Sequence, residues 1–205
     1  MYTPASFAVD DLPTHHDFID HHGFATLISQ SDEPLASHLP FLLDRQAAPQ
    51  GRLRSHMARA NPQWKSADGS RVLVIFNGPH AYISPRWYAA ENVVPTWNYV
   101  AVHVYGTLRL VDDGATVSRI VDETVARYEA DSPQPWRYAG DADFLDRLLQ
   151  MIVGFEIDID RIEGKWKLSQ NHPVERREGV IRGLREIGDP AADDIARLMQ
   201  ETLDR

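Results

Sequence analysis

Three segments of the chain bring basic, amide and aromatic side chains together. They read SHLPFLLD at 37–44, SHMARANPQWK at 55–65, and GPHAYISPRWY at 78–88, which runs on to VPTWNYVAVHVYG at 94–106. In the second, His56, Arg59 and Asn61 stand within six residues at the predicted end of a strand. These donors suit the binding of a phosphate or a carboxylate. The alternative is a turn made by Asn61 and Pro62, with Arg59 in a surface ion pair.

A fourth polar segment, KWKLSQN, covers residues 165–171. Lys165 and Lys167 would share one face of a strand, and Ser169, Gln170 and Asn171 follow where that strand must end. This pattern favours an anion or carbonyl site and an exposed edge strand guarded by lysines about equally.

Large aromatic side chains are numerous for a chain of this length and could form the walls of a site for a flat ligand. For any one of them, packing in the core is the more common role. The residues are Trp64, Trp87, Tyr88, Trp97, Tyr99, Trp136 and Trp166.

Standard catalytic signatures are absent from the sequence: it contains no GxSxG, HExxH, GxxxxGK[ST] or GxGxxG. Enzyme activity is therefore neither indicated nor excluded by a motif. His15, His16, His21 and His22 crowd one short segment, but without a recognised ligand spacing. We expect no metal site there, and instead a solvent-exposed, pH-sensitive surface.

The elements that must position these side chains are mainly strands. Runs rich in β-branched, aromatic and leucine residues predict strands at 24–30, 35–44, 51–58, 71–77, 81–84 and 97–111, and two more within 153–169 joined near 163–164. Alternation over 100–110 predicts one buried face, with Gly106 at a bend. Several strands at short spacing are typical of a barrel or sandwich.

Helical patterns predict a short helix at 14–22, helices in an insertion at about 113–151, and C-terminal helices at about 173–204. Asp189 is a candidate cap for the last helix and Pro190 suits its first position. We expect the apolar stripe of that helix to pack on its own domain, with a dimer contact as the minority interpretation.

Composition predicts one domain over residues 1–205. The absence of cysteine and of any apolar run near eighteen residues predicts a cytoplasmic protein outside the membrane. The formal net charge of −9 argues against a general DNA-coating role. Residues 161–187 are the exception, with seven basic and four acidic side chains.

The order of the motifs resembles the PaiB-like family of FMN-binding negative transcriptional regulators. MYTPASF, FATLIS, SHLPFLLD, HMARANPQW, VLVIFNGPHAYISPRWY, VPTWNYVAVHVYG, KWKLSQN and GVIRGL carry the resemblance over residues 1–184. Ser55 stands where the family usually has glycine. The resemblance implies a mainly β fold with peripheral helices (α+β), an antiparallel Greek-key split β-barrel of the flavin-reductase type. It also implies a homodimer with two FMN sites at the subunit interface.

This resemblance, tested against the needs of FMN, gives a set of expected cofactor-binding residues. Arg59 and Asn61 would contact the phosphate, with Ser55 and His56 nearby. The wider set adds Lys65 as a weaker phosphate contact, His38 from the preceding strand, Trp97 and Asn98 beside the ribityl chain or ring, and Lys167 and Gln170 donating to the ring edge from the same or the facing subunit.

Three functions follow as hypotheses. The leading one is an FMN-binding dimer that negatively regulates transcription. The alternative is a flavin-dependent oxidoreductase acting on a small metabolite, since split barrels commonly perform this chemistry. Direct DNA binding is favoured only by residues 161–187, and no helix-turn-helix is evident.

Overall fold

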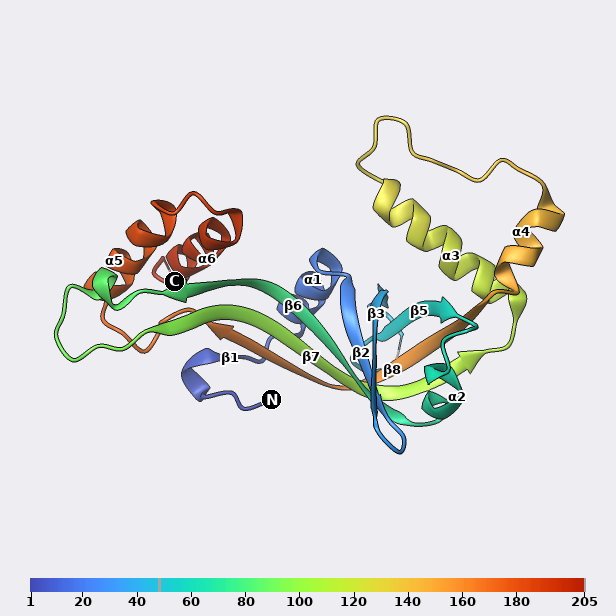
Figure 1. Cartoon of the computed structure of the whole chain (residues 1–205), viewed down its shortest axis with the longest axis horizontal. Coiled ribbons are helices and arrows are strands. Elements are labelled where there is room, and N and C mark those ends of the chain that lie inside the picture. The colour runs from blue at the N-terminus through green and yellow to red at the C-terminus, as the bar shows by residue number, and fades with distance from the viewer. Residues whose placement is uncertain (48, 205) are drawn as a thin grey trace. The chain divides into compact units, whose positions relative to one another are not determined.

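The computed structural model describes residues 1–47 and 49–204. Its strands form one sheet in the order β3-β2-β6-β7-β8-β5-β4, and β1 pairs with β8 (Figure 1). The strands are β1 (Ala8–Val9), β2 (Phe24–Gln30), β3 (Pro34–Pro40), β4 (Leu42–Asp44), β5 (Arg52–Ala58), β6 (Arg71–Ile83), β7 (Thr96–Val111) and β8 (Ile152–Lys167). Pairing is antiparallel for β1–β8, β2–β3, β2–β6, β4–β5 and β5–β8.

The helices in the described part of the chain are α1 (Leu12–His21), α2 (Gln63–Ala67), α3 (Gly114–Glu129), α4 (Ala142–Leu149), α5 (Val174–Arg185) and α6 (Pro190–Glu201). Two 3₁₀ turns, η1 (Ala5–Phe7) and η2 (Pro85–Tyr88), complete the elements. Asp189 caps α6 by accepting from the Ala192 amide, and Pro190 is the first helical residue, as predicted. No helix among the described residues combines the length and the apolar character that crossing a membrane requires.

The chain divides into two compact units. Unit 1 comprises residues 1–11, 77–102 and 163–205, and unit 2 comprises residues 12–76 and 103–162. The boundaries fall inside β6, β7 and β8, so each of these three strands passes from one unit into the other. The single domain expected from composition stays a prediction.

Unit 2 is built around aromatic and aliphatic side chains from the inward faces of its strands. Phe41 lies edge-on to Phe76 and Phe155, with ring centroids 5.9 and 6.1 Å apart. Leu53 and Leu108 of the same unit are also fully buried. Phe41 also separates β3 from β4, so the strand predicted over 35–44 is divided in two.

Unit 1 carries α5 and α6, which pack against each other, and α5 also packs on η2. Ile195 and Met199 of α6 are fully buried within this unit, so the C-terminal stripe packs on its own unit as expected. Gly179 and Gly183 lie one turn apart on α5, and a Cβ at Gly183 would come within 2.5 Å of the Trp87 ring. Because glycine has no side chain, these two positions leave the space that Trp87 occupies.

Two predicted strand breaks are wrong. Residues 71–83 form one strand, β6; Pro79 lies beyond the stretch that pairs with β2, at 73–75, so its missing N–H removes no hydrogen bond to β2. Residues 152–167 likewise form one strand, β8, because Gly164 pairs with Val9 of β1 and does not turn the chain.

Only part of the histidine cluster is the exposed surface that we expected, since His21 is exposed but two of its neighbours in α1 are not. His15 and His16 are buried, and His16 Nε2–H donates to the Gln50 carbonyl at 2.9 Å. The reason is that α1 turns these two residues and Ile19 inward. No group of three or more potential metal ligands occurs among the described residues.

Gly106 marks a close approach between β7 and β8. A Cβ at this position would lie 2.2 Å from the Asp158 carbonyl oxygen and 2.7 Å from Ile157 Cγ2. We expect Gly106→Ala to lower the free energy of unfolding by about 1–3 kcal/mol, because backbone has to shift. Urea unfolding measures this. Gly114→Ala is the matched control, since no atom lies within 4 Å of the added methyl, and a comparable loss in it would contradict the steric explanation.

Candidate functional site

The C-terminal half of β5 presents predicted ligand residues to opposite faces of the sheet. Ser55 is 1% exposed and its hydroxyl donates to the Pro40 carbonyl at 2.6 Å. His56 points the other way, because successive side chains of a strand alternate. The structure therefore does not bring Ser55 and His56 together, and the Ser55 hydroxyl already has an acceptor.

Arg59 follows β5 directly and joins it to the start of β8. Its amide donates to the Met151 carbonyl at 2.8 Å, and its guanidinium donates to the carbonyls of Gln150 and Ile152 at 2.7 Å each. Within the described residues Arg59 has no ion pair, so the alternative of a surface ion pair is wrong, and two of its five guanidinium N–H groups bind backbone carbonyls. Arg59 positions the β5 end, and only the rest of its guanidinium is available to a ligand.

Asn61 holds the turn after β5 against the neighbouring β2–β3 hairpin. Its Nδ2 donates to the Ser37 hydroxyl at 2.8 Å, and its Oδ1 accepts from the Gln63 amide at 3.0 Å. Gln63, which is 2% exposed, accepts from the Ser37 hydroxyl at 2.5 Å and donates to Ser29 Oγ at 3.0 Å. Sequence reasoning missed Gln63 because its partners are 26 and 34 residues away.

Two other predicted contacts in unit 2 are exposed. Lys65 lies on α2 with its ammonium 5.6 Å from the centre of the Trp64 ring, and among the described residues it makes no ion pair. His38 is on the exposed face of β3, where its Nδ1 is hydrogen-bonded to the Thr26 hydroxyl at 3.0 Å and its ring stacks on Phe24. Of the unit 2 residues expected to contact a phosphate, Lys65 has the fewest N–H groups already bonded to protein atoms.

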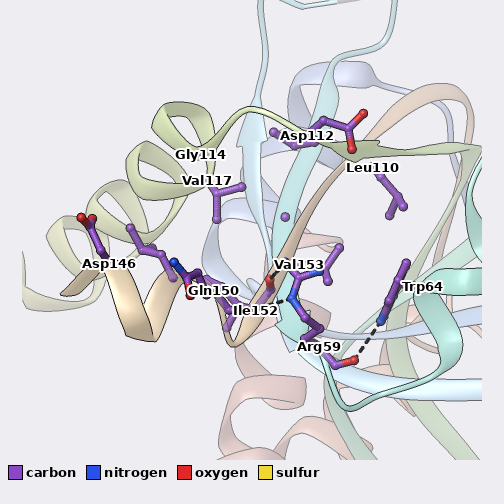
Figure 2. A pocket seen from close by; sticks show the side chains of 13 residues that line it. Arg59, Trp64, Leu110, Asp112, Gly114, Val117, Asp146, Gln150, Ile152 and Val153 are labelled. Atoms are coloured by element: carbon purple, nitrogen blue, oxygen red, sulfur yellow. Dashed lines mark hydrogen bonds between the residues drawn. The ribbon is translucent and has the colours of Figure 1, made fainter. Parts of the chain in front are cut away.

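Arg59 and Trp64 line a hollow of about 520 Å³ in unit 2 (Figure 2). The indole Nε1–H of Trp64 donates to the Arg59 carbonyl at 3.1 Å, so the two residues form one wall. The end of β7, the start of α3, the end of α4 and the start of β8 form the rest, with Asp112 between β7 and α3 and Asp146 on α4. This hollow is therefore mixed in charge.

A second hollow of about 910 Å³ in unit 2 is mainly apolar. Trp136, Tyr138 and aliphatic side chains of α3 and α4 line it, and His56 reaches it from β5. It shares Leu149 and Ile152 with the first hollow. Its size and aromatic lining fit a flat ring system.

His56 is the polar group that this apolar hollow leaves unsatisfied. Its Nδ1 is buried and has no hydrogen-bond partner among residues 1–47 and 49–204. Burial lowers the pKa of His56 below the ordinary imidazole value of 6.5. At neutral pH the ring is therefore uncharged, and it can form one hydrogen bond with a bound molecule.

The remaining predicted site residues lie in unit 1. Asn98 is fully buried and donates to Ser169 Oγ at 3.0 Å, which makes it part of the core. Trp97 is 53% exposed and contacts the rings of His80 and Tyr82. The Gln170 side chain closes its own turn, accepting from the Leu168 amide at 2.8 Å and donating to the Trp166 carbonyl at 2.6 Å.

The two lysines of β8 are not guards of an open edge. Lys165 is 7% exposed, lies in the stretch of β8 that pairs with β1, and donates to the Tyr2 carbonyl at 3.0 Å. Lys167 donates to Thr96 Oγ1 at 2.6 Å and to the Trp97 carbonyl at 2.5 Å. Burial, followed by the charge of Lys165, lowers the pKa of Lys167.

The sheet and its peripheral helices define the class of the fold, which is that of flavin-binding split-barrel proteins. The chain superposes on the flavocytochrome Anf3 from Azotobacter vinelandii with a TM-score of 0.60 at 16% identity, over 78% of this chain and 69% of the other. The FAD and heme binding protein from Mycobacterium smegmatis gives a TM-score of 0.59 at 16% identity, over 78% and 73%. These likenesses confirm the predicted fold class.

The family follows from sequence comparison. Residues 1–161 match the family described as "Putative FMN-binding domain". The chain is 36% identical to the "Protease synthase and sporulation protein PAI 2" of Bacillus subtilis, over 99% of this chain and 98% of the other. An uncharacterised protein of Aspergillus fumigatus is 31% identical over 98% and 97%. The chain belongs to this FMN-binding family, which confirms the resemblance and its cofactor, FMN.

The lowered pKa of His56 predicts a loss of stability in acid. Below about pH 6.5 the unfolded chain binds a proton at His56 that the folded chain does not, so the free energy of unfolding falls as the pH drops toward the folded pKa. We expect His56→Gln to reduce this fall. Urea midpoints at pH 7.5 and 5.5 measure it. The exposed His21→Gln is the control, and an undiminished fall in His56→Gln would contradict the assignment.

Proposed function

We propose that the chain is an FMN-binding homodimer that negatively regulates transcription. The observation that carries this proposal is the match to the Bacillus subtilis protein along almost the whole length of both chains, together with membership of the FMN-binding family. Regulation through a partner or a metabolite fits the net charge of −9 better than direct DNA contact does.

The flavin contacts that we propose lie along residues 56–65. FMN needs cationic or N–H donors for its phosphate and a mainly apolar wall for its ring. Lys65, with the remaining N–H groups of Arg59, supplies the positive charge. His56 supplies a neutral hydrogen-bonding group beside the apolar hollow of about 910 Å³. Bound FMN would supply redox chemistry, while these residues hold and orient it.

Flavin titration tests the phosphate contact. We expect Lys65→Met to weaken FMN about 10- to 100-fold, since a hydrogen bond to a charged group contributes about 1.5–3 kcal/mol, and to leave riboflavin unchanged. Flavin fluorescence on the flavin-free chain measures both affinities.

The matched control is Arg119→Met, which removes an exposed cation from α3. It should leave both affinities at the wild-type value. An equal loss of FMN and riboflavin in Lys65→Met would refute the phosphate contact, and a wild-type chain that binds neither flavin would refute the FMN half of the proposal. Rapid bleaching of bound flavin by NADH or NADPH would instead favour the flavin-dependent oxidoreductase.

The regulatory half predicts a response in the host cell. Deleting the gene should raise the transcripts that the protein represses, and the wild-type gene should restore them while the Lys65→Met gene does not. RNA sequencing of the three strains measures this. Sedimentation should give a mass near twice 23.2 kDa. An unchanged transcriptome or a monomeric mass would contradict the corresponding part of the proposal.

A further inference from the structure

Unit 1 contains a hollow of about 360 Å³ that none of the proposed flavin contacts in residues 56–65 lines. Lys167 at the end of β8, His172 in the following turn and Arg176 in the first turn of α5 line it, and we call it the basic hollow. Tyr88 of η2 and Phe7 of η1 form apolar wall. Its volume is that of a small-molecule site.

The lining of the basic hollow carries cationic side chains and no carboxylate, although Glu175 lies in the first turn of α5 beside Arg176. None of its lining residues is acidic, and Arg176 has no ion pair among residues 1–47 and 49–204. Lys167 donates to the neutral oxygens of Thr96 and Trp97, not to a carboxylate. Burial, then Arg176, then Lys167 lower the pKa of His172, so these groups act on one another through their charge. An anion in the hollow would relieve this repulsion.

The buried hydroxyl of Tyr88 is a second, independent observation. The residue is 3% exposed, and its hydroxyl oxygen is buried without a hydrogen bond to any described residue. Leaving such a group unsatisfied costs about 1–3 kcal/mol, so buried hydroxyls normally have partners. Burial raises the pKa of Tyr88, so the phenol remains protonated and can donate; the nearby Ser169 hydroxyl, which lies outside hydrogen-bonding geometry, and the charge of Arg176 oppose this more weakly. Its ring is held beside His172, with centroids 5.0 Å apart.

The start of α5 adds further donors. This helix of twelve residues begins after Pro173, and no side chain caps it within the described chain. Its first-turn N–H groups therefore keep their hydrogen-bonding capacity, and the helix dipole places partial positive charge at the same end.

The turn that carries these groups is fixed before any ligand binds. Ser169 adopts a left-handed conformation, with φ of 65°, and its hydroxyl is hydrogen-bonded to buried Asn98. The amide of His172 donates to the Ser169 carbonyl at 3.0 Å. A strained residue held by the core gives a rigid platform. The donors of the hollow are thus preorganised, which reduces the entropy lost on binding.

We propose that the basic hollow binds the phosphate or carboxylate group of a small molecule, with Arg176, His172, Lys167 and the Tyr88 hydroxyl as its contacts. The anion has two possible sources, a separate metabolite that acts as an effector or the phosphate of the flavin itself. Both present the same oxyanion to the same donors.

Inorganic phosphate is the probe for the flavin-free full-length chain, titrated by calorimetry at constant ionic strength. We expect one saturable site. Arg176→Gln should weaken binding at least about tenfold, the loss expected for a hydrogen bond to a charged group. Arg185→Gln, an exposed arginine in the last turn of the same helix, should keep wild-type affinity. Absence of saturable binding, or equal affinity in all three proteins, would overturn the proposal.

Tyr88→Phe separates ligand binding from folding. Removing an unsatisfied buried hydroxyl should raise the melting temperature of the free chain and weaken phosphate binding several-fold. A purely structural tyrosine would lose stability and leave phosphate affinity unchanged, and that result would remove Tyr88 from the site and overturn the proposed donor set.

A second experiment, with flavin present, identifies the source of the anion. If the flavin phosphate occupies the hollow, inorganic phosphate competes with FMN but not with riboflavin, and Arg176→Gln weakens FMN alone. If a separate effector occupies it, phosphate binds equally well to the FMN-loaded chain. Either result supports the site. Because the phosphate titration needs no flavin, it gives its answer even if FMN binding itself fails.

Discussion

The close approach of β7 to β8 at Gly106 is the constraint on which the unit 2 site depends. Because glycine lets the two backbones meet there, β8 lies where β5 can pair with it, with Arg52 opposite Asp158 and Ala58 opposite Ile152. That register brings the end of β5 to the start of β8, where the Arg59 guanidinium binds two carbonyls. The positions of His56 and Arg59 follow from this pairing, whereas Lys65 is placed by α2, which packs on β2.

Satisfying buried polar groups decides which side chains remain for a ligand. Ser55, Asn61 and Gln170 looked like ligand donors in the sequence, but each has protein partners in the structure. A buried donor or acceptor without a partner costs free energy, so the fold uses nearby polar groups first. The exceptions are informative for this reason. His56 Nδ1 and the Tyr88 hydroxyl are buried without partners among the described residues, and each of these two residues lines a hollow.

Local patterns predicted much of the fold, and long-range pairing accounts for most of what they missed. The strand predicted at 24–30 is found with those bounds, and the alternation over 100–110 matches the buried face of β7. Gly164 was misread as a turn because its partner, Val9, lies far away in the sequence. At the site, residue types were predictable from their chemistry. Their partners were not, because Ser37 and Asn61, or Asn98 and Ser169, meet only after the sheet has formed.

The charge distribution of the chain bears on the kind of ligand that we propose. A net charge of −9 repels polyanions over the whole surface, but salt screens such effects beyond about 8 Å. Within that range the cations nearest a bound anion contribute most of the electrostatic attraction to it. Lys65 in unit 2 and Arg176 in unit 1 are such cations, since neither has an ion pair among the described residues. A hollow of about 360 Å³ is large enough for a small anion. If the proposed anion site and the proposed regulatory role both hold, regulation through a small phosphorylated or carboxylated ligand would need no DNA-binding surface on this protein.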